Sequence, residues 1–263
     1  MRVLLPSHGI YGQTAVNMKT LTIEDMIEMS KYNKNDFLRR IEVVRRVSDV
    51  KLDKITWCDL CYLYDICCFS LMRGQIEYNV KCPVCGEVTK QSMYLADLEI
   101  EELPRRFKNP MEVVSMGKTY KFRLLRASDV LDAVDQSMYA DDEETELLLS
   151  KTALIFGMQA TDIDFAKSLN LSQIVAATEF DRFYYHGFVR VGHTVCGNSS
   201  CNHEFDIRFD TPTSLVSLDP KSLLDSYTGL ADYISYSDIL RLSLEEFNYF
   251  VDQLNDKFNN SNA

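Results

Sequence analysis

Two pairs of cysteines stand in short segments rich in turn-forming residues, and their spacing is that of metal ligands. The segments read Cys82-Pro83-Val84-Cys85-Gly86 and Cys196-Gly197-Asn198-Ser199-Ser200-Cys201. A C-x-x-C turn directs both sulfurs at one point, and Gly86 permits the left-handed backbone on which such a turn ends. The second pair is spaced more widely, but the residues between its cysteines all favour turns. The sequence therefore predicts one zinc ion bound by Cys82, Cys85, Cys196 and Cys201.

Other potential ligands lie near the second pair and in one apolar segment. His193 and His203 are alternative ligands if one of the four sulfurs does not reach the metal. The remaining cysteines, Cys58, Cys61, Cys67 and Cys68, fall in a segment that we expect to be a buried helix. Cysteine acts there as a small hydrophobic residue, and a second metal or redox site is the alternative. Four thiolates leave no open coordination position for water, so the predicted zinc is structural and not hydrolytic.

Composition and missing motifs argue against several function classes. The chain of 263 residues has 28 Lys and Arg against 39 Asp and Glu, a net charge of −11, which is unlike a cationic nucleic-acid binder. The motifs of nucleotide-binding loops, zinc proteases and serine hydrolases are absent, so we expect no enzymatic activity. A catalytic triad dispersed through the fold would leave no local motif and stays open. We also expect no membrane span and synthesis in the cytosol, because no apolar window approaches ~18 residues.

Strand periodicity surrounds both cysteine pairs and places each pair at the tip of a hairpin. Apolar and polar residues alternate over 75–96 and again over 187–210, the two halves of a zinc-ribbon-like β module. The halves are separated by far more than the ~15 to 20 residues of a compact zinc finger. We therefore expect residues 97–186, with one short strand at 119–125, to form a mainly helical insertion. The predicted fold class is α+β, and sulfurs around one zinc would lie under ~4 Å apart.

Helix signals dominate both ends of the chain. Residues 1–74 read as an extended N-terminal segment followed by helices, and residues 211–263 read as C-terminal helices. Capping boxes are predicted at Thr22-x-x-Asp25, Thr56-x-x-Asp59 and Ser243-x-x-Glu246. The last helix carries an apolar seam at Leu244, Phe247, Val251, Leu254 and Phe258. Such a seam packs on a core or on a partner chain.

Aromatic and acidic residues gather in two further segments. The aromatic residues between Phe180 and Phe188 are interpreted as core or interface residues, and a stacking platform for bases is the alternative. The run Asp141 to Glu144 consists of four acids and is typical of a solvated loop or a helix N-terminus. We expect the aromatic segment and the C-terminal seam to supply anchors for protein docking.

Several short motifs resemble the baseplate hub proteins of contractile-tailed, T4-like bacteriophages. An L-P-S-x-G-x-x-Y-like start is formed by Leu5, Pro6, Ser7, Gly9 and Tyr11. A middle element is formed by Asp59, Tyr62, Leu63, Asp65, Leu71, Arg73 and Gly74, and the first cysteine pair follows it. The resemblance spans roughly residues 5–210, and the wider second pair departs from the C-x-x-C of the first.

This resemblance implies a structural, non-enzymatic virion protein of the tail baseplate. Such a protein is made in the cytoplasm of the infected bacterium and docks with other baseplate and tail proteins in a multimeric assembly. The alternative is a zinc-ribbon interaction module of a nucleic-acid-processing or transcription complex. Against this alternative, few basic residues accompany the cysteine pairs: Lys81 and Lys90 near the first, Arg190 and Arg208 near the second. A metal-dependent or cysteine hydrolase would need an open ligand position or an activated thiol.

Overall fold

The protein mixes helices with small two-stranded sheets, which confirms the α+β class. The computed structural model describes residues 1–29, 36–71, 75–137, 170–189, 191–208, 230–231 and 233–261. The acidic run Asp141 to Glu144 lies outside these residues. The described chain forms two compact units that interleave along the sequence. Unit 1 contains Met1–Lys19, Asn35–Tyr64 and Ile100–Gly187, and unit 2 contains Thr20–Lys34, Asp65–Glu99 and Phe188–Ala263.

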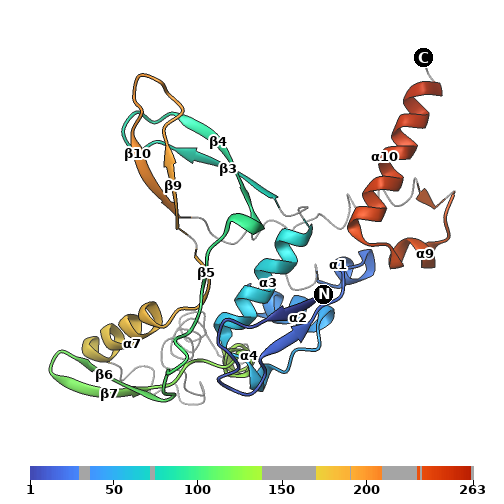
Figure 1. Ribbon diagram of the computed structural model, residues 1–263. Coiled ribbons are helices and arrows are strands. Elements are labelled where there is room, and N and C mark those ends of the chain that lie inside the picture. Colours follow the sequence, from blue (N-terminus) through green and yellow to red (C-terminus); the bar gives the residue numbers. More distant parts are fainter. Residues whose placement is uncertain are drawn as a thin grey trace. The chain divides into compact units, whose positions relative to one another are not determined.

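Unit 1 holds most of the short strands and several helices (Figure 1). Its elements are β1 (Arg2–Leu4), β2 (Ala15–Asn17), α2 (Asp36–Val47), η2 (Leu52–Lys54), the first part of α3 (Trp57–Leu71), β5 (Ile100–Glu101), β6 (Met111–Ser115), β7 (Lys118–Phe122), α4 (Ala127–Ser137) and α7 (Leu171–Phe183). β1 and β2 are antiparallel, with Val3 opposite Val16. β8 (Gly187–Phe188) lies at the boundary between the two units along the chain.

The expected single strand at 119–125 is in fact one arm of a hairpin. β6 pairs with β7 in antiparallel register, from Met111 opposite Phe122 to Ser115 opposite Lys118. Met116 and Gly117 connect the strands with φ angles of 49° and 74°, the left-handed backbone of a tight hairpin turn. The hairpin supports an apolar core against α7, made of Leu103, Phe122, Leu124, Ala176, Ala177 and Phe180.

Helix α3 begins at the predicted capping box and is buried on nearly every side. The Thr56 hydroxyl accepts a hydrogen bond from the Asp59 N–H at 3.0 Å, and the Asp59 carboxylate accepts from the Thr56 N–H at 3.1 Å. The prediction that this segment forms a buried helix is confirmed. Its buried residues include Leu60, Leu63, Tyr64, Ile66, Cys67, Cys68 and Phe69. The helix is therefore a central element and not an amphipathic one.

Unit 2 contains both cysteine-bearing hairpins together with helices. Its elements are α1 (Ile23–Met29), the second part of α3, β3 (Gln75–Lys81), β4 (Val88–Tyr94), η3 (Leu95–Asp97), β9 (Val191–Val195), β10 (Glu204–Arg208), α9 (Tyr236–Arg241) and α10 (Leu244–Ser261). The predicted capping boxes of α1 and α10 are confirmed by reciprocal bonds between Thr22 and Asp25 and between Ser243 and Glu246. Within the described residues, no helix is both long and apolar enough to cross a membrane.

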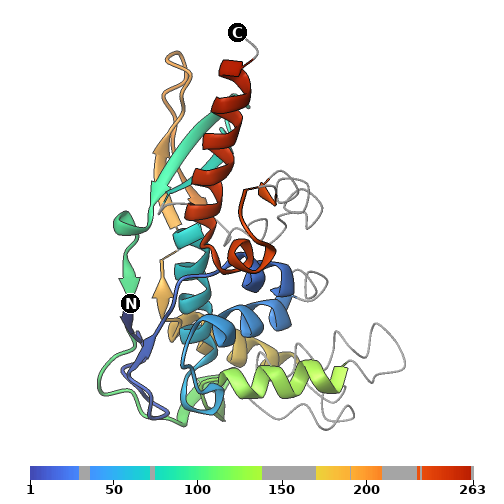
Figure 2. The same cartoon turned by 90° about the vertical axis from the view of Figure 1, so that its right-hand side faces the viewer.

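The two hairpins of unit 2 lie side by side in both views (Figures 1 and 2). β3 pairs with β4 from Gln75 opposite Tyr94 to Lys81 opposite Val88. β9 pairs with β10, and Val195 lies opposite Glu204 at the end of that ladder. Each ladder ends directly before the first cysteine of its pair, so the strands carry all four cysteines to the hairpin tips.

Candidate metal centre

The four predicted ligands meet although the chain separates them widely. The sulfur atoms of Cys82, Cys85, Cys196 and Cys201 all lie within 4.8 Å of one another. Cys85 and Cys196 are 111 residues apart, yet their sulfurs are 3.4 Å apart, and those of Cys82 and Cys201 are 4.0 Å apart. Four thiolates at ~2.3 Å from one ion would lie ~3.8 Å apart, close to this arrangement. The prediction that the two cysteine pairs converge is confirmed, and we call these residues the four-cysteine cluster.

The first pair lies on a tight turn that closes the β3–β4 hairpin. The N–H of Cys82 donates to the carbonyl of Glu87 at 2.8 Å, and the N–H of Gly86 donates to the carbonyl of Cys82 at 3.0 Å. Gly86 has a φ of 76°, as expected from the sequence. This left-handed residue returns the chain to β4 directly after Cys85.

The turn of the second pair closes in the same way, with four residues between its cysteines where the first turn has two. The N–H of Cys196 donates to the carbonyl of His203 at 2.9 Å, which corresponds to the bond from Cys82 to Glu87. Asn202 follows Cys201 with a φ of 45°, so it occupies the position that Gly86 holds in the first turn. Asparagine is among the few non-glycine residues that adopt this backbone readily. Asn202 was not predicted, although its residue type and its place directly after Cys201 are the signal for this backbone.

A close contact joins the two turns beside the cluster. The N–H of Gly197 donates to the Thr89 hydroxyl at 3.2 Å. A β-carbon added at Gly197 would lie 2.7 Å from that oxygen, which is closer than atoms approach without a shift. Gly197 is therefore needed for the close approach of the hairpins and not only for its turn. Thr89 had no signal in the sequence, because its role depends on the opposite hairpin.

The thiols of the four-cysteine cluster differ in their pKa values. The backbone N–H groups of Cys85 and Val84 donate toward the Cys82 sulfur and lower its pKa to about 7. The N–H of Asn198 acts in the same direction on Cys196, but burial and the neighbouring thiols outweigh it and raise the pKa of Cys196 to about 12. One thiolate thus opposes ionisation of its neighbours, and a divalent cation among them would remove that opposition.

Neither histidine near the second pair belongs to the cluster. His193 points to the acidic face of the β9–β10 hairpin, where its ring nitrogens lie 3.1 Å from Asp206 and 3.6 Å from Glu204. The hydrogen bond with Asp206 raises the pKa of His193 above its ordinary value. His203 stacks on Phe205, with ring centroids 5.9 Å apart. Among the described residues, the metal-ligating group consists of the four cysteines alone.

A buried polar network in unit 1 resembles a catalytic triad in composition but not in geometry. His186 Nε2 lies 2.7 Å from the Thr56 hydroxyl and His186 Nδ1 lies 3.0 Å from the Tyr184 carbonyl. A carbonyl can only accept, so in the neutral ring Nδ1 carries the proton and Nε2 accepts from Thr56. The Asp59 carboxylate lies 3.9 Å from Nε2, whereas a triad needs the carboxylate at the other nitrogen. Thr56, Asp59 and His186 are all fully buried, so this network fixes the start of α3.

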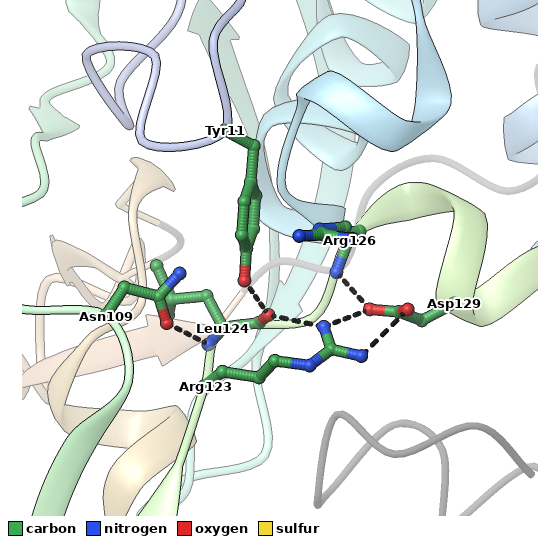
Figure 3. A network of polar contacts seen from close by, with 6 residues as sticks. All are labelled: Tyr11, Asn109, Arg123, Leu124, Arg126 and Asp129. Atoms are coloured by element: carbon green, nitrogen blue, oxygen red, sulfur yellow. Dashed lines mark hydrogen bonds and ion pairs between the residues drawn. The ribbon is translucent and has the colours of Figure 1, made fainter.

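A second network in unit 1 joins the N-terminal loop to β7 and α4 (Figure 3). Its members are Tyr11, Asn109, Arg123, Leu124, Arg126 and Asp129. Asp129 accepts from both terminal nitrogens of Arg123, at 2.5 and 2.9 Å, and from the N–H of Arg126. The bonds from Arg123 to Asp129 raise the pKa of Arg123, and the bond from the Arg126 N–H caps α4, which begins at Ala127. Tyr11 donates to the Leu124 carbonyl, so Tyr11 of the N-terminal motif has a structural role.

Comparison of the chain with protein-family models, with curated proteins and with solved structures gave no match.

Proposed function

We propose that the four-cysteine cluster binds one zinc ion and that this ion locks two hairpins into a zinc-ribbon-like module. The convergence of four sulfurs from distant parts of the chain is the observation that carries the proposal. Zinc accepts a tetrahedron of four thiolates without preference from its d electrons, and this ligand set is typical of structural sites. Bound zinc would leave no coordination position for a substrate, so the site stabilises the fold.

We infer that the protein works through protein contacts as a structural, non-enzymatic component of a phage tail baseplate. Large apolar side chains are exposed on the two hairpins at Val84, Val88, Tyr94, Val191 and Val195. Single exposed apolar residues are ordinary, but five on one small module favour a docking surface. The resemblance of the N-terminal and first-cysteine motifs to baseplate hub proteins supports the same inference.

The aromatic anchors expected from the sequence divide into two groups. Phe180, Phe188 and Phe247 are at most 4 % exposed, so these three residues lie in the core, which is one of the two interpretations that the sequence allows. Phe183 is 78 % exposed and Tyr249 is 59 % exposed. Exposed aromatic side chains can become buried anchors at an interface. Introduction of a negative charge at these two positions is therefore a sharper test of docking than a change at Phe247.

Complementation of tail assembly tests the docking role. The protein would be supplied in trans to the phage that encodes it, after deletion of the phage copy, and complete tails would be counted by electron microscopy. We expect Phe183→Asp or Tyr249→Asp to reduce complete tails while the purified variants retain the native circular dichroism spectrum. Lys51→Glu, a change at an exposed position, is the matched control.

The zinc-ribbon alternative predicts a different outcome. A module of a nucleic-acid-processing complex would leave tail numbers unchanged and would bind DNA or RNA at physiological salt. The acidic face formed by Glu204 and Asp206 beside His193 argues against such binding. Normal tails together with salt-sensitive nucleic-acid binding would replace the baseplate proposal with this alternative.

A further inference from the structure

The cysteines outside the cluster differ in their surroundings. No disulfide joins any of the eight cysteines, all of which lie in the described part of the chain. Cys67 and Cys68 are buried deep in α3, and burial raises the pKa of the Cys67 thiol well above its usual value. Cys58 is only half-buried, and Cys61 is 8 % exposed. The thiols of α3 thus include a partly exposed one, Cys58, and a nearly buried one, Cys61, three residues later.

The pair Cys58 and Cys61 lies in the first turns of α3. The helix starts at Trp57, directly after its capping residue Thr56, and Cys58 is the next residue. Residues three apart on a helix share a face, with β-carbons ~5 to 6 Å apart. The positive end of the helix dipole favours a thiolate in the first turn, where Cys58 lies, and Cys61 follows in the second turn. The C-x-x-C spacing is that of thiol–disulfide exchange motifs.

A cation lies against the inner sulfur. The Nη1 atom of Arg40 donates to Cys61 Sγ at 3.5 Å, while its Nη2 atom bonds Asp36 at 3.1 Å. The guanidinium carbon of Arg40 lies 5.5 Å from the centre of the Tyr64 ring, which helps to hold the side chain in place. A neighbouring cation stabilises a thiolate at Cys61, and this observation is independent of the helix N-terminus.

We propose that Cys58 and Cys61 form a reversible dithiol–disulfide couple that is separate from the four-cysteine cluster. In glutathione buffer, the Cys58 thiolate attacks a sulfur of glutathione disulfide and releases one glutathione thiolate. The Cys61 thiolate then attacks the Cys58 sulfur, which forms the Cys58–Cys61 bond and releases the second glutathione thiolate. Two electrons pass from the two protein thiols to glutathione disulfide, and their two protons go to solvent or to glutathione.

The helical spacing makes this disulfide easy to reduce. A disulfide needs β-carbons ~3.5 to 4.5 Å apart, so its formation pulls the first turn of α3 inward from the regular spacing. Strained disulfides have more oxidising potentials and are the labile ones in proteins. The couple therefore stays reduced in a reducing compartment and oxidises when glutathione disulfide accumulates.

Redox titration of the zinc-loaded, full-length protein tests the proposal. The protein would be equilibrated in glutathione buffers of increasing oxidised fraction, quenched in acid, alkylated and analysed by mass spectrometry with peptide fragmentation. We expect a linkage between residues 58 and 61 that dithiothreitol removes, with unchanged zinc content throughout. At neutral pH, Cys58 should react with iodoacetamide at least about tenfold faster than Cys67.

Single substitutions distinguish this pair from the other thiols. Cys58→Ser and Cys61→Ser should each abolish the linkage, whereas Cys67→Ser and Cys68→Ser should leave it intact. The proposal is overturned if folded protein remains fully reduced in the most oxidising buffer, or if the disulfide that forms joins any other pair of cysteines. Because zinc content is measured in the same samples, failure of this couple is distinguishable from failure of the zinc site.

Discussion

The residue after the second cysteine of each pair determines whether the turn can present two sulfurs at once. Gly86 and Asn202 both adopt a left-handed backbone there, with φ angles of 76° and 45°. A β-branched side chain at either position would be strained, because its β-carbon approaches the neighbouring carbonyl. Both the C-x4-C turn and the C-x-x-C turn therefore bring their two sulfurs to the cluster with a left-handed residue directly after the second cysteine.

A substitution at Gly197 should disturb the cluster through Thr89. Gly197→Ala adds a β-carbon 2.7 Å from the Thr89 hydroxyl oxygen and 3.0 Å from its methyl carbon. We expect a destabilisation of ~1 to 3 kcal/mol and faster zinc loss to a chelator. Thr89→Ala removes both atoms, so the double variant should regain most of this loss. Equal effects of Gly197→Ala with and without Thr89 would contradict the contact.

Proton release should accompany zinc binding. Burial, and after it the neighbouring thiols, raise the pKa of Cys196 and of Cys201, so both are protonated in metal-free protein at pH 7. Zinc binds thiolates, so at pH 7 its binding should release about two protons or more. As pH rises above the pKa of each thiol, the number released should fall. Calorimetry in buffers of different ionisation enthalpy measures this number, and a value below about one would contradict thiolate ligation.

Ligand types could be predicted from the sequence, whereas the contacts that bring the ligands together could not. All four cysteines and the left-handed Gly86 follow from local spacing and turn chemistry. Thr89 acts through the opposite hairpin and has no signal in the sequence. Asn202 acts through its backbone angle, and its only signal is its residue type directly after Cys201. The partner of Phe247 could not be decided from the sequence for a related reason, because an apolar seam has the same spacing whether a core or another chain covers it.

Among the secondary-structure elements, the capped helix starts are the features that the sequence predicts best. The two residues of a capping box are only three positions apart, so the bond between them depends on local sequence alone. The boxes of α1, α3 and α10 begin at Thr22, Thr56 and Ser243, as their sequences predict. Strand β6 was missed because the adjoining connector is acidic and interrupted by proline, and its pairing with β7 depends on the Met116–Gly117 turn. Bonds between residues close in sequence can thus be predicted from the sequence, whereas the pairing of two strands with weak strand patterns cannot.

Removal of the Asp59 carboxylate should loosen the start of α3. Asp59 accepts from the N–H groups of Ser7 and Thr56, both at 3.1 Å, in a fully buried site. Asp59→Ala leaves both donors unsatisfied, and we expect a loss of about 3 kcal/mol in unfolding free energy. Urea unfolding can be followed by the fluorescence of Trp57, the single tryptophan of the chain.

The matched control for this change lies on the surface. Asp49 also accepts two hydrogen bonds, from the backbone and side chain of Asn17 at 2.8 and 2.7 Å, but it is exposed to water. We expect Asp49→Ala to cost less than about 1 kcal/mol, since water replaces the lost acceptor. Similar losses for the two variants would show that burial of Asp59 is not the source of its effect.

At the scale of the whole molecule, the chain crosses between two units several times. Each unit consists of three segments that are separated in the sequence, so no single stretch of the chain contains a whole unit. In unit 2 the two hairpins come from segments separated by a long part of unit 1. A metal that joins these hairpins would therefore close a large loop, and loop closure restricts the unfolded chain.

This topology gives zinc a testable role in folding. Chelation of the metal should increase hydrogen exchange at the tips of the β3–β4 and β9–β10 hairpins, where Cys82 and Cys196 donate the closing bonds. Exchange in α3 around Leu63, which is fully buried in the other unit, should change much less. Uniform protection before and after chelation would show that the hairpins hold together without a metal.

The most direct test of the central claim is the metal content of the purified full-length protein, measured by inductively coupled plasma mass spectrometry. The four-cysteine cluster predicts one zinc per chain in the native protein and in Cys67→Ser, which leaves the cluster intact. Cys82→Ser and Cys196→Ser should each lose most of the zinc, because either change removes a buried ligand. Native protein purified without chelators and free of zinc, or zinc retained in full by both ligand variants, would contradict the account.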